Sequence, residues 1–115
     1  MTTVTIGVES MAAVKARMRA AMKGVPQGAH ISFASLDALW ETLNQRRWEI
    51  VRTMTGAGPL SIREVARRVE RDVKTVHGDV QTLLKAGVLD KTASGKVVFP
   101  YDAVHVDFML EPIPA

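Results

Sequence analysis

Residues 61–89 read SIREVARRVERDVKTVHGDVQTLLKAGVL, and this stretch decides the fold that the chain is expected to adopt. Apolar residues recur at helical spacing over 62–69 and again over 73–84, while polar and charged residues fill the opposite sides. Only residues 70–72 lie between the two runs, and Gly87 is placed to end the second. The pattern predicts two short amphipathic helices joined by a tight charged turn.

Both predicted helices carry a start signal at their first residue. Ser61 is a good N-cap, and Glu64 three residues later completes the S-x-x-E pattern of a capping box. Asp72 caps the second helix, and its negative charge suits the positive end of the helix dipole. The segment 88–100 then predicts two strands around residues 93–95, a compact hairpin of the kind called a wing.

A turn this short forces the two helices to cross steeply, so the second is presented as a ridge that can enter the major groove of DNA. Its outward face and the cations beside it are the predicted DNA contacts. They are Arg67, Arg68, Arg71, Lys74, Thr75, His77, Gly78, Gln81, Thr82, Lys85 and Lys96. The basic members are expected to contact phosphates, with Lys96 doing so from the wing. Lys74, Thr75 and Gln81 are expected to reach base edges.

Three neighbours in the middle of the second helix need separate interpretation. Gly78 in a helix interior costs about 1 kcal/mol relative to alanine. This glycine is explained by close approach of a partner molecule, by a tight helix–helix contact, or by a fold that tolerates the cost without any such contact. His77, at the edge of the outward face, is expected to contact a phosphate or water rather than to catalyse a reaction. Asp79 is placed on the flank of that face, where a negative charge argues mildly against DNA.

The distribution of charge supports the same interpretation. The chain has 115 residues and a formal net charge of +3, which suits one domain with a modest core, or a small domain with a dimerisation arm. Residues 44–91 hold ten basic and six acidic side chains, whereas residues 92–115 hold one basic and three acidic ones. Charge alone would indicate a solvated helical surface, but its coincidence with the motif favours a surface that faces phosphates.

Other classes of function find little support in the sequence. There are no cysteines, and His30, His77 and His105 have no metal-ligand spacing. The segment 56–59 lacks the Lys-Ser/Thr of a phosphate-binding loop. No apolar run approaches the ~20 residues of a membrane span, and the first residues do not resemble a signal peptide. We therefore expect a soluble cytoplasmic protein that is not an enzyme, binds no cofactor or metal and has no membrane partner.

The remainder of the chain predicts strands at both ends. The segment 2–8 alternates and is rich in β-branched residues, 31–33 is a second short strand, and 101–110 is a third. We expect an α+β fold, mainly α, in which a winged helix-turn-helix carries additional N- and C-terminal strands. Exposed strand edges are usually hidden by pairing, so we expect a dimer held through these ends. A monomer with an intrachain terminal sheet is the competing arrangement.

A candidate domain boundary follows the first predicted helix. That helix, 10–23, has methionines on one side and four basic residues on the other, and two more helices follow before the stretch quoted above. The break GVPQG at 24–28 separates it from them. We therefore divide the chain into residues 1–28, an N-terminal strand-helix arm for dimerisation or partner binding, and residues 29–115, a winged helix-turn-helix DNA-binding domain with a C-terminal strand.

The segment from about Asn44 to Tyr101 resembles the MarR-like and ArsR-like winged-helix transcriptional regulators of bacteria and archaea. The likeness lies in RRWEIVRTM at 46–54, in the quoted stretch and in the strand-rich tail, and it is nearest to small regulators of the antitoxin type. It implies a winged-helix fold, binding of double-stranded DNA through the second motif helix, a homodimer, and a toxin protein encoded nearby as a partner. The long C-terminal dimerisation helix of typical MarR proteins is lacking, so their dimer arrangement and effector pocket are not carried over.

These observations predict a sequence-specific double-stranded DNA-binding transcriptional regulator that acts as a repressor, with an autorepressing antitoxin of a toxin-antitoxin pair as the narrower reading. The alternative is a winged-helix protein–protein interaction module that does not bind DNA. The outward residues of the second helix discriminate between the two, because interaction modules tend to carry acidic or apolar residues there. This helix instead presents Lys74, Thr75, Gln81 and Lys85.

Overall fold

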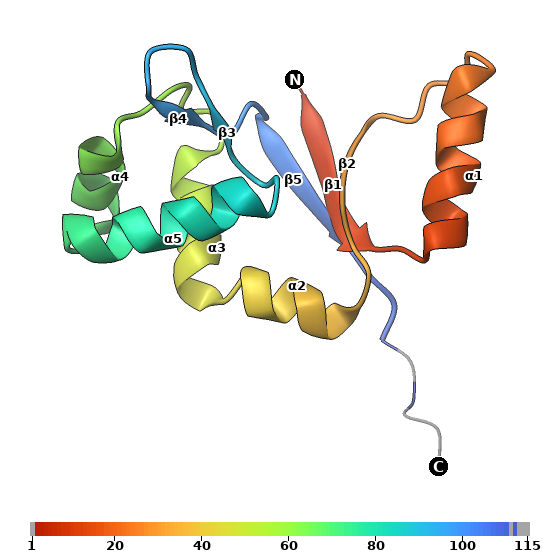
Figure 1. Cartoon of the computed structure of the whole chain (residues 1–115), viewed down its shortest axis with the longest axis horizontal. Coiled ribbons are helices and arrows are strands. Elements are labelled where there is room, and N and C mark those ends of the chain that lie inside the picture. The colour runs from red at the N-terminus through yellow and green to blue at the C-terminus, as the bar shows by residue number, and fades with distance from the viewer. Residues whose placement is uncertain (1, 111, 113–115) are drawn as a thin grey trace.

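The chain folds into an α+β structure of five helices and five strands over the residues described, 2–110 and 112, in this computed structural model (Figure 1). In chain order the elements are β1 (Thr3–Val8), α1 (Met11–Met22), β2 (Ala29–Phe33), α2 (Leu36–Thr42), α3 (Gln45–Met54), α4 (Ile62–Val69), α5 (Val73–Lys85), β3 (Asp90–Lys91), β4 (Val97–Val98) and β5 (Ala103–Asp107). The predicted α+β class is confirmed, and so are the predicted helices. The strands differ in length: β2 starts two residues earlier than expected, while β3, β4 and β5 are shorter.

The terminal strands form one parallel sheet in the order β2-β1-β5, with β1 in the centre. The register aligns Ile6 of β1 with Ile31 and Val106, and Val4 with Ala29 and Val104. Because side chains alternate along a strand, this alignment gathers the apolar residues of all three strands on one face.

That face of the sheet packs into the hydrophobic core of the chain. Val4 and Ile6 are completely buried and share the core with Leu39 of α2 and Ile50 of α3. Of the two arrangements considered for the terminal strands, the structure has the intrachain sheet. The expectation that residues 2–8 offer a strand edge to a dimer partner is therefore wrong, because both edges of β1 are already hydrogen-bonded within the chain.

The helix α1 is attached to the sheet mainly by polar contacts. It contains no buried residue, and it stands beside the sheet at the far end from α4 and α5 (Figure 1). Arg17 forms an ion pair of 2.7 Å with Glu9 and donates a 3.2 Å hydrogen bond to Ser32. The boundary predicted after residue 28 falls between the hydrogen-bonded neighbours β1 and β2, so β1 shares the sheet of the second segment. The division into two domains stays a prediction.

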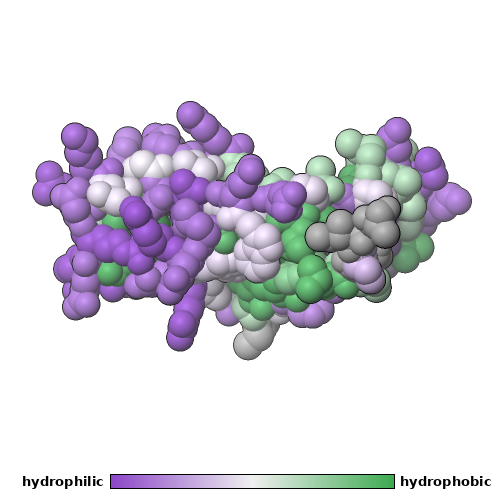
Figure 2. All heavy atoms as spheres, turned by 90° about the horizontal axis from the view of Figure 1, so that it is seen from below, coloured by the Kyte–Doolittle hydropathy of each residue, from purple (hydrophilic) through white to green (hydrophobic). Residues whose placement is uncertain are grey.

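The helices α3, α4 and α5 pack together around a second part of the same core. Val65, Val76, Val80 and Leu83 are completely buried there, and Met54 of α3 is buried with them. The hairpin of β3 and β4 is antiparallel, and an isolated bridge joins Val97 to Leu60 just before α4. Hydrophilic residues cover the end of the molecule that holds α4 and α5, whereas apolar residues gather in the middle and towards α1 (Figure 2).

The two predicted N-caps and the predicted terminal glycine act where they were expected. The hydroxyl of Ser61 accepts the backbone N–H of Glu64 at 3.1 Å, and the carboxylate of Asp72 accepts that of Thr75 at 3.1 Å. Gly87 adopts a φ of +78°, and the next N–H, of Val88, returns to the carbonyl of Leu83 at 2.9 Å. This pair of features is the Schellman ending of α5.

Candidate nucleic-acid interface

The predicted outward face of α5 is on the surface of the molecule. Lys74, Thr75, His77, Gly78 and Lys85 are exposed, and Gln81 and Thr82 are partly exposed. The opposite face of the helix carries the buried valines and leucine of the core. The hydroxyl of Thr75 lies 3.4 Å from the carboxylate of the N-cap Asp72, and that of Thr82 donates to the Gly78 carbonyl at 3.2 Å. The structure therefore brings this part of the predicted site together on one face.

Gly78 leaves the backbone of α5 open to the outside. A Cβ added at this position would meet no heavy atom within 4 Å in the described part of the chain. A tight helix–helix contact within the chain is thus excluded as the reason for the glycine. Two of its explanations remain, close approach of a partner molecule and simple tolerance.

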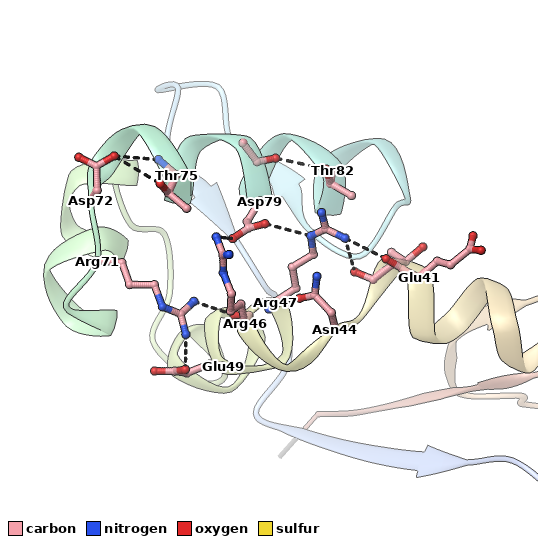
Figure 3. A network of polar contacts seen from close by, with 12 residues as sticks. Glu41, Asn44, Arg46, Arg47, Glu49, Arg71, Asp72, Thr75, Asp79 and Thr82 are labelled. Atoms are coloured by element: carbon pink, nitrogen blue, oxygen red, sulfur yellow. Dashed lines mark hydrogen bonds and ion pairs between the residues drawn. The ribbon is translucent and has the colours of Figure 1, made fainter.

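The interpretation of Asp79 as a residue on the flank of the outward face is wrong. Its side chain is buried and faces α3, where Arg47 Nε donates to Asp79 Oδ1 at 3.1 Å (Figure 3). Arg46 Nη2 lies 3.6 Å from the other carboxylate oxygen. Asp79 follows Val76 by three residues and precedes Leu83 by four, which places it on the core side of the helix. The negative charge of Asp79 is therefore paired with arginines of the same chain and does not face a molecule bound to the outward face of α5.

Arg47 extends this contact into a network that joins three helices. Its Nη1 donates to the backbone carbonyls of Glu41 at 2.9 Å and Thr42 at 3.3 Å, which lie at the C-terminal end of α2. Carbonyls at the end of a helix lack intrahelical partners, so a guanidinium satisfies them well. The network thus fixes α5 against α3 and against the last turn of α2 (Figure 3).

Arg71, in the turn between α4 and α5, is directed towards α3. It forms an ion pair with Glu49 and donates a 3.2 Å hydrogen bond to the carbonyl of Arg46 (Figure 3). Its side chain is 23% exposed, against 71% for Arg67. The contacts of Arg71 position the turn, whereas its predicted contact with a phosphate stays a prediction.

Arg67 and Arg68 are exposed on α4, and both are paired with Glu64. The Nε atom of each guanidinium lies 2.8 Å from a carboxylate oxygen of Glu64. These hydrogen bonds lower the pKa of Glu64 to about 2, and the same contact raises the pKa of Arg67. The Glu64 carboxylate therefore binds the two arginines instead of completing the expected capping box. Pairs this exposed can be exchanged for phosphate at low cost.

The hairpin supplies Lys96 as predicted, in the turn before β4, and a second exposed cation that was not predicted. Lys91 in β3 lies opposite Val97 and is exposed. Its position in the predicted hairpin was a sufficient reason to include Lys91 among the predicted DNA contacts. Arg46 was also missed: its side chain is 55% exposed although one end reaches Asp79. Only the tertiary contact shows that this arginine lies beside α5.

The arrangement offers exposed cations, amide and hydroxyl groups on α4, α5 and the hairpin, a chemistry that is suited to binding an extended anion. Within residues 2–110 no group of three His, Cys, Asp or Glu side chains could hold a metal ion. No helix of the described chain is long and apolar enough to cross a membrane. A groove of about 920 Å³ lies elsewhere, between α3 and β5.

The fold and this surface define an α+β protein in which two short helices and a hairpin present a basic face. The chain matches the model of the HVO_A0114 family over residues 42–106. That span covers more than half of the chain, and the protein belongs to this family. The matched span runs from the last residue of α2 into β5 and so contains α4, α5 and the hairpin, with all the cations of the basic face. Comparisons with curated proteins and with solved structures found no match.

Proposed function

We propose that this protein is a sequence-specific double-stranded DNA-binding transcriptional regulator, a repressor that acts by binding rather than by catalysis. In this proposal α3, α4, α5 and the β3–β4 hairpin form a winged helix-turn-helix, and α5 enters the major groove. The observation that carries the proposal is the outward face of α5, where Lys74, Thr75 and Gln81 surround an unobstructed backbone at Gly78.

The chemistry of this face suits base edges. A glutamine can pair with adenine through two hydrogen bonds, and a lysine can donate to the acceptors of guanine. Gln81 lies two turns after Lys74, so the two side chains project from the same side of α5 about 10 Å apart. The absence of a side chain at Gly78, between them, lets the helix axis approach the groove more closely.

Exposed cations on the elements next to α5 support a contact with the phosphate backbone. Arg67 and Arg68 lie on α4, and Lys91 and Lys96 lie on the hairpin. Phosphate contacts orient a protein on the duplex but carry no sequence information. The internal network of Asp79 and Arg47 supports the proposal indirectly, because it holds α5 in one position relative to these cations.

The competing function is a protein–protein interaction module that does not touch DNA. The exposed side chains of α5 itself, Val73–Lys85, include no carboxylate, since Asp79 is turned inward, and the one carboxylate at the start of the face is that of the N-cap Asp72. An anionic partner therefore fits this face better than an apolar one.

Selection of tight-binding duplexes from a random pool, followed by fluorescence anisotropy, tests the proposed function. Removing one phosphate contact with Lys85→Ala should flatten the slope of log K against log salt by about 0.9. Gln81→Ala should reduce the preference at one base position and leave non-specific affinity nearly unchanged. Lys15→Ala on α1 is the matched control, because it removes the same charge far from α5. No duplex selected, or equal effects of Lys85→Ala and Lys15→Ala, would refute the proposal.

A second candidate role, neutralisation of a toxin encoded nearby, is favoured by the surface of α1. Met11, Met18 and Met22 are 69%, 59% and 87% exposed on one side of this helix. Flexible methionines suit a surface that adapts to another protein. Deleting residues 1–28 would remove β1 from the centre of the sheet, so Met18→Lys with Met22→Lys is the sharper test. On this reading the double variant still binds DNA but no longer protects cells that co-express the neighbouring gene product; full protection would exclude α1 as the toxin-binding element.

A further inference from the structure

The strand β5 has one edge that is not used in the sheet. It pairs with β1 on one side only among the described residues. The N–H of Ala103 points to β1, where it donates to the Thr2 carbonyl at 3.1 Å. Because successive residues of a strand direct their backbone groups to opposite sides, Val104 and Val106 present theirs on the free edge. Such an edge is a template for another strand.

A groove adjoins this strand. The groove of about 920 Å³ between β5 and α3 is lined by Val104 and Val106 from the strand and by Trp48 and Arg52 from the helix. Val106 is 42% exposed although it continues the buried face of the sheet. An apolar face that ends at an open edge indicates that something apolar covers it.

The sequence of β5 and the following residue is complementary to itself in the antiparallel direction. Residues 104–108 read VHVDF, which is apolar, basic, apolar, acidic, apolar. If two copies pair with Val106 on the two-fold axis, Val104 lies opposite Phe108 of the partner subunit. His105 then lies opposite Asp107 of the partner subunit, and the symmetry repeats both pairs.

Neighbouring registers lack this complementarity. A two-fold axis at His105 would place Asp107 opposite Ala103 of the partner subunit, and an axis at Asp107 would place two carboxylates together. Like charges directly opposite each other destabilise a strand pair. With the axis at Val106, the apolar residues share the face that packs on the helices, and the charged pairs share the other face.

We propose that the protein forms a homodimer in which β5 of each copy pairs antiparallel with β5 of the other, with Val106 on the axis. The two sheets then become one sheet of six strands, in the order β2-β1-β5-β5-β1-β2. The inference deepens the proposed function, since it supplies the second copy that a two-fold symmetric DNA site requires. It rests on the strand itself, and its test contains no DNA, so either proposal can fail while the other stands.

Cysteine cross-linking gives a direct test because the natural chain contains no cysteine. Residues on the axis of an antiparallel pair have Cα atoms about 5.5 Å apart, which is within the range of a disulfide. Val106→Cys should therefore form a covalent dimer under mild oxidation. Val104→Cys is the matched control, because its two copies would lie about 13 Å apart along the strands. Equal cross-linking of both variants, or of neither, would overturn the proposed pairing.

Charge exchange tests the register in solution by light scattering and sedimentation. His105→Glu should weaken the dimer by about tenfold, because it places two pairs of carboxylates opposite each other. Asp107→Lys should also weaken the dimer, because it removes the carboxylate that faces each imidazole. The double variant should restore the dimer, since it exchanges the signs and keeps the pairs opposite. Both side chains are exposed, and circular dichroism checks that each variant folds. The inference would be overturned if the wild-type protein stayed monomeric at about 100 μM, or if the double variant dimerised no more tightly than the single variants.

Discussion

Removing the carboxylate of Asp79 should destabilise the protein strongly, although the residue lies in the middle of the proposed recognition helix. Asp79 as a whole is 7% exposed, and its carboxylate forms an ion pair with Arg47, whose side chain is 19% exposed. Taking one partner from a buried ion pair costs about 3–5 kcal/mol, because the remaining charge is left without compensation. Arg46, at 55% exposure, can turn to water. We therefore expect the lower end, a loss of about 3 kcal/mol for Asp79→Ala.

Urea denaturation followed by circular dichroism measures this loss. With a slope of about 1–3 kcal/mol per molar urea, a loss of ~3 kcal/mol lowers the midpoint by about 1–3 M. Asp90→Ala removes the same group from an exposed position in β3 and should shift the midpoint little. Asp79→Asn keeps an acceptor for Arg47 and should lose less than Asp79→Ala.

A double-mutant cycle with Arg47→Met separates the ion pair from the other contacts. Arg47 also satisfies the carbonyls of Glu41 and Thr42, so its single substitution carries an additional cost. The coupling between Asp79 and Arg47 should exceed about 1 kcal/mol, as expected for residues that share one network. A loss below about 0.5 kcal/mol for Asp79→Ala, within the range of ordinary surface changes, would refute the argument that this pair fixes α5.

Three further changes test other parts of the structure. Gly7→Ala would place a Cβ 2.2 Å from the backbone carbonyl oxygen of Asp107, so β5 must move away from β1; we expect a loss above about 2 kcal/mol in urea denaturation, and an unchanged midpoint would contradict the pairing. Gly78→Ala should instead stabilise α5 by up to about 1 kcal/mol and weaken specific DNA binding in anisotropy, whereas unaltered binding would show that the backbone does not approach DNA closely. The pKa of Glu64, about 2 against an ordinary 4.5, means that its pairing stabilises the fold fully above pH 4.5 and is lost as the pH falls towards 2. Glu64→Gln should flatten the dependence of stability on pH in that window and, by releasing Arg67, tighten non-specific DNA binding; an unaltered pH profile would show that the pair does not contribute.

The helix ends were predictable because their signals act over a few residues. An N-cap hydroxyl or carboxylate needs only the N–H groups of the next turn, so Ser61 and Asp72 could be identified from the sequence alone. Gly87 ends α5 because its φ of +78° is accessible without strain. The outward face of α5 was also predictable, since helical periodicity separates it from the buried valines.

The partners of the charged residues were not predictable in the same way. Asp79 and Arg47 are 32 residues apart, and Arg71 reaches Glu49 over 22 residues. A long charged side chain can reach many positions, so its partner depends on which helices pack together. The spacing of Asp79 from Val76 and Leu83 already indicated the core side of α5, and the interpretation as a flank residue overlooked it. The packing of α5 against α3 shows which residue Asp79 contacts there.

By itself, the sequence determined that the chain has two short capped helices, a hairpin, and strands near both ends. Alternation and β-branched residues indicate a strand wherever it pairs, so 2–8 could be recognised without knowledge of its neighbours. Only the tertiary structure decided that β1 lies between β2 and β5 and that all three run parallel. The pairing joins residues up to 100 positions apart, and it is selected by burial of Val4 and Ile6 against the helices. The local sequence pattern indicates that a segment forms a strand. Which strands pair with each other is determined by the hydrophobic core that the whole chain forms.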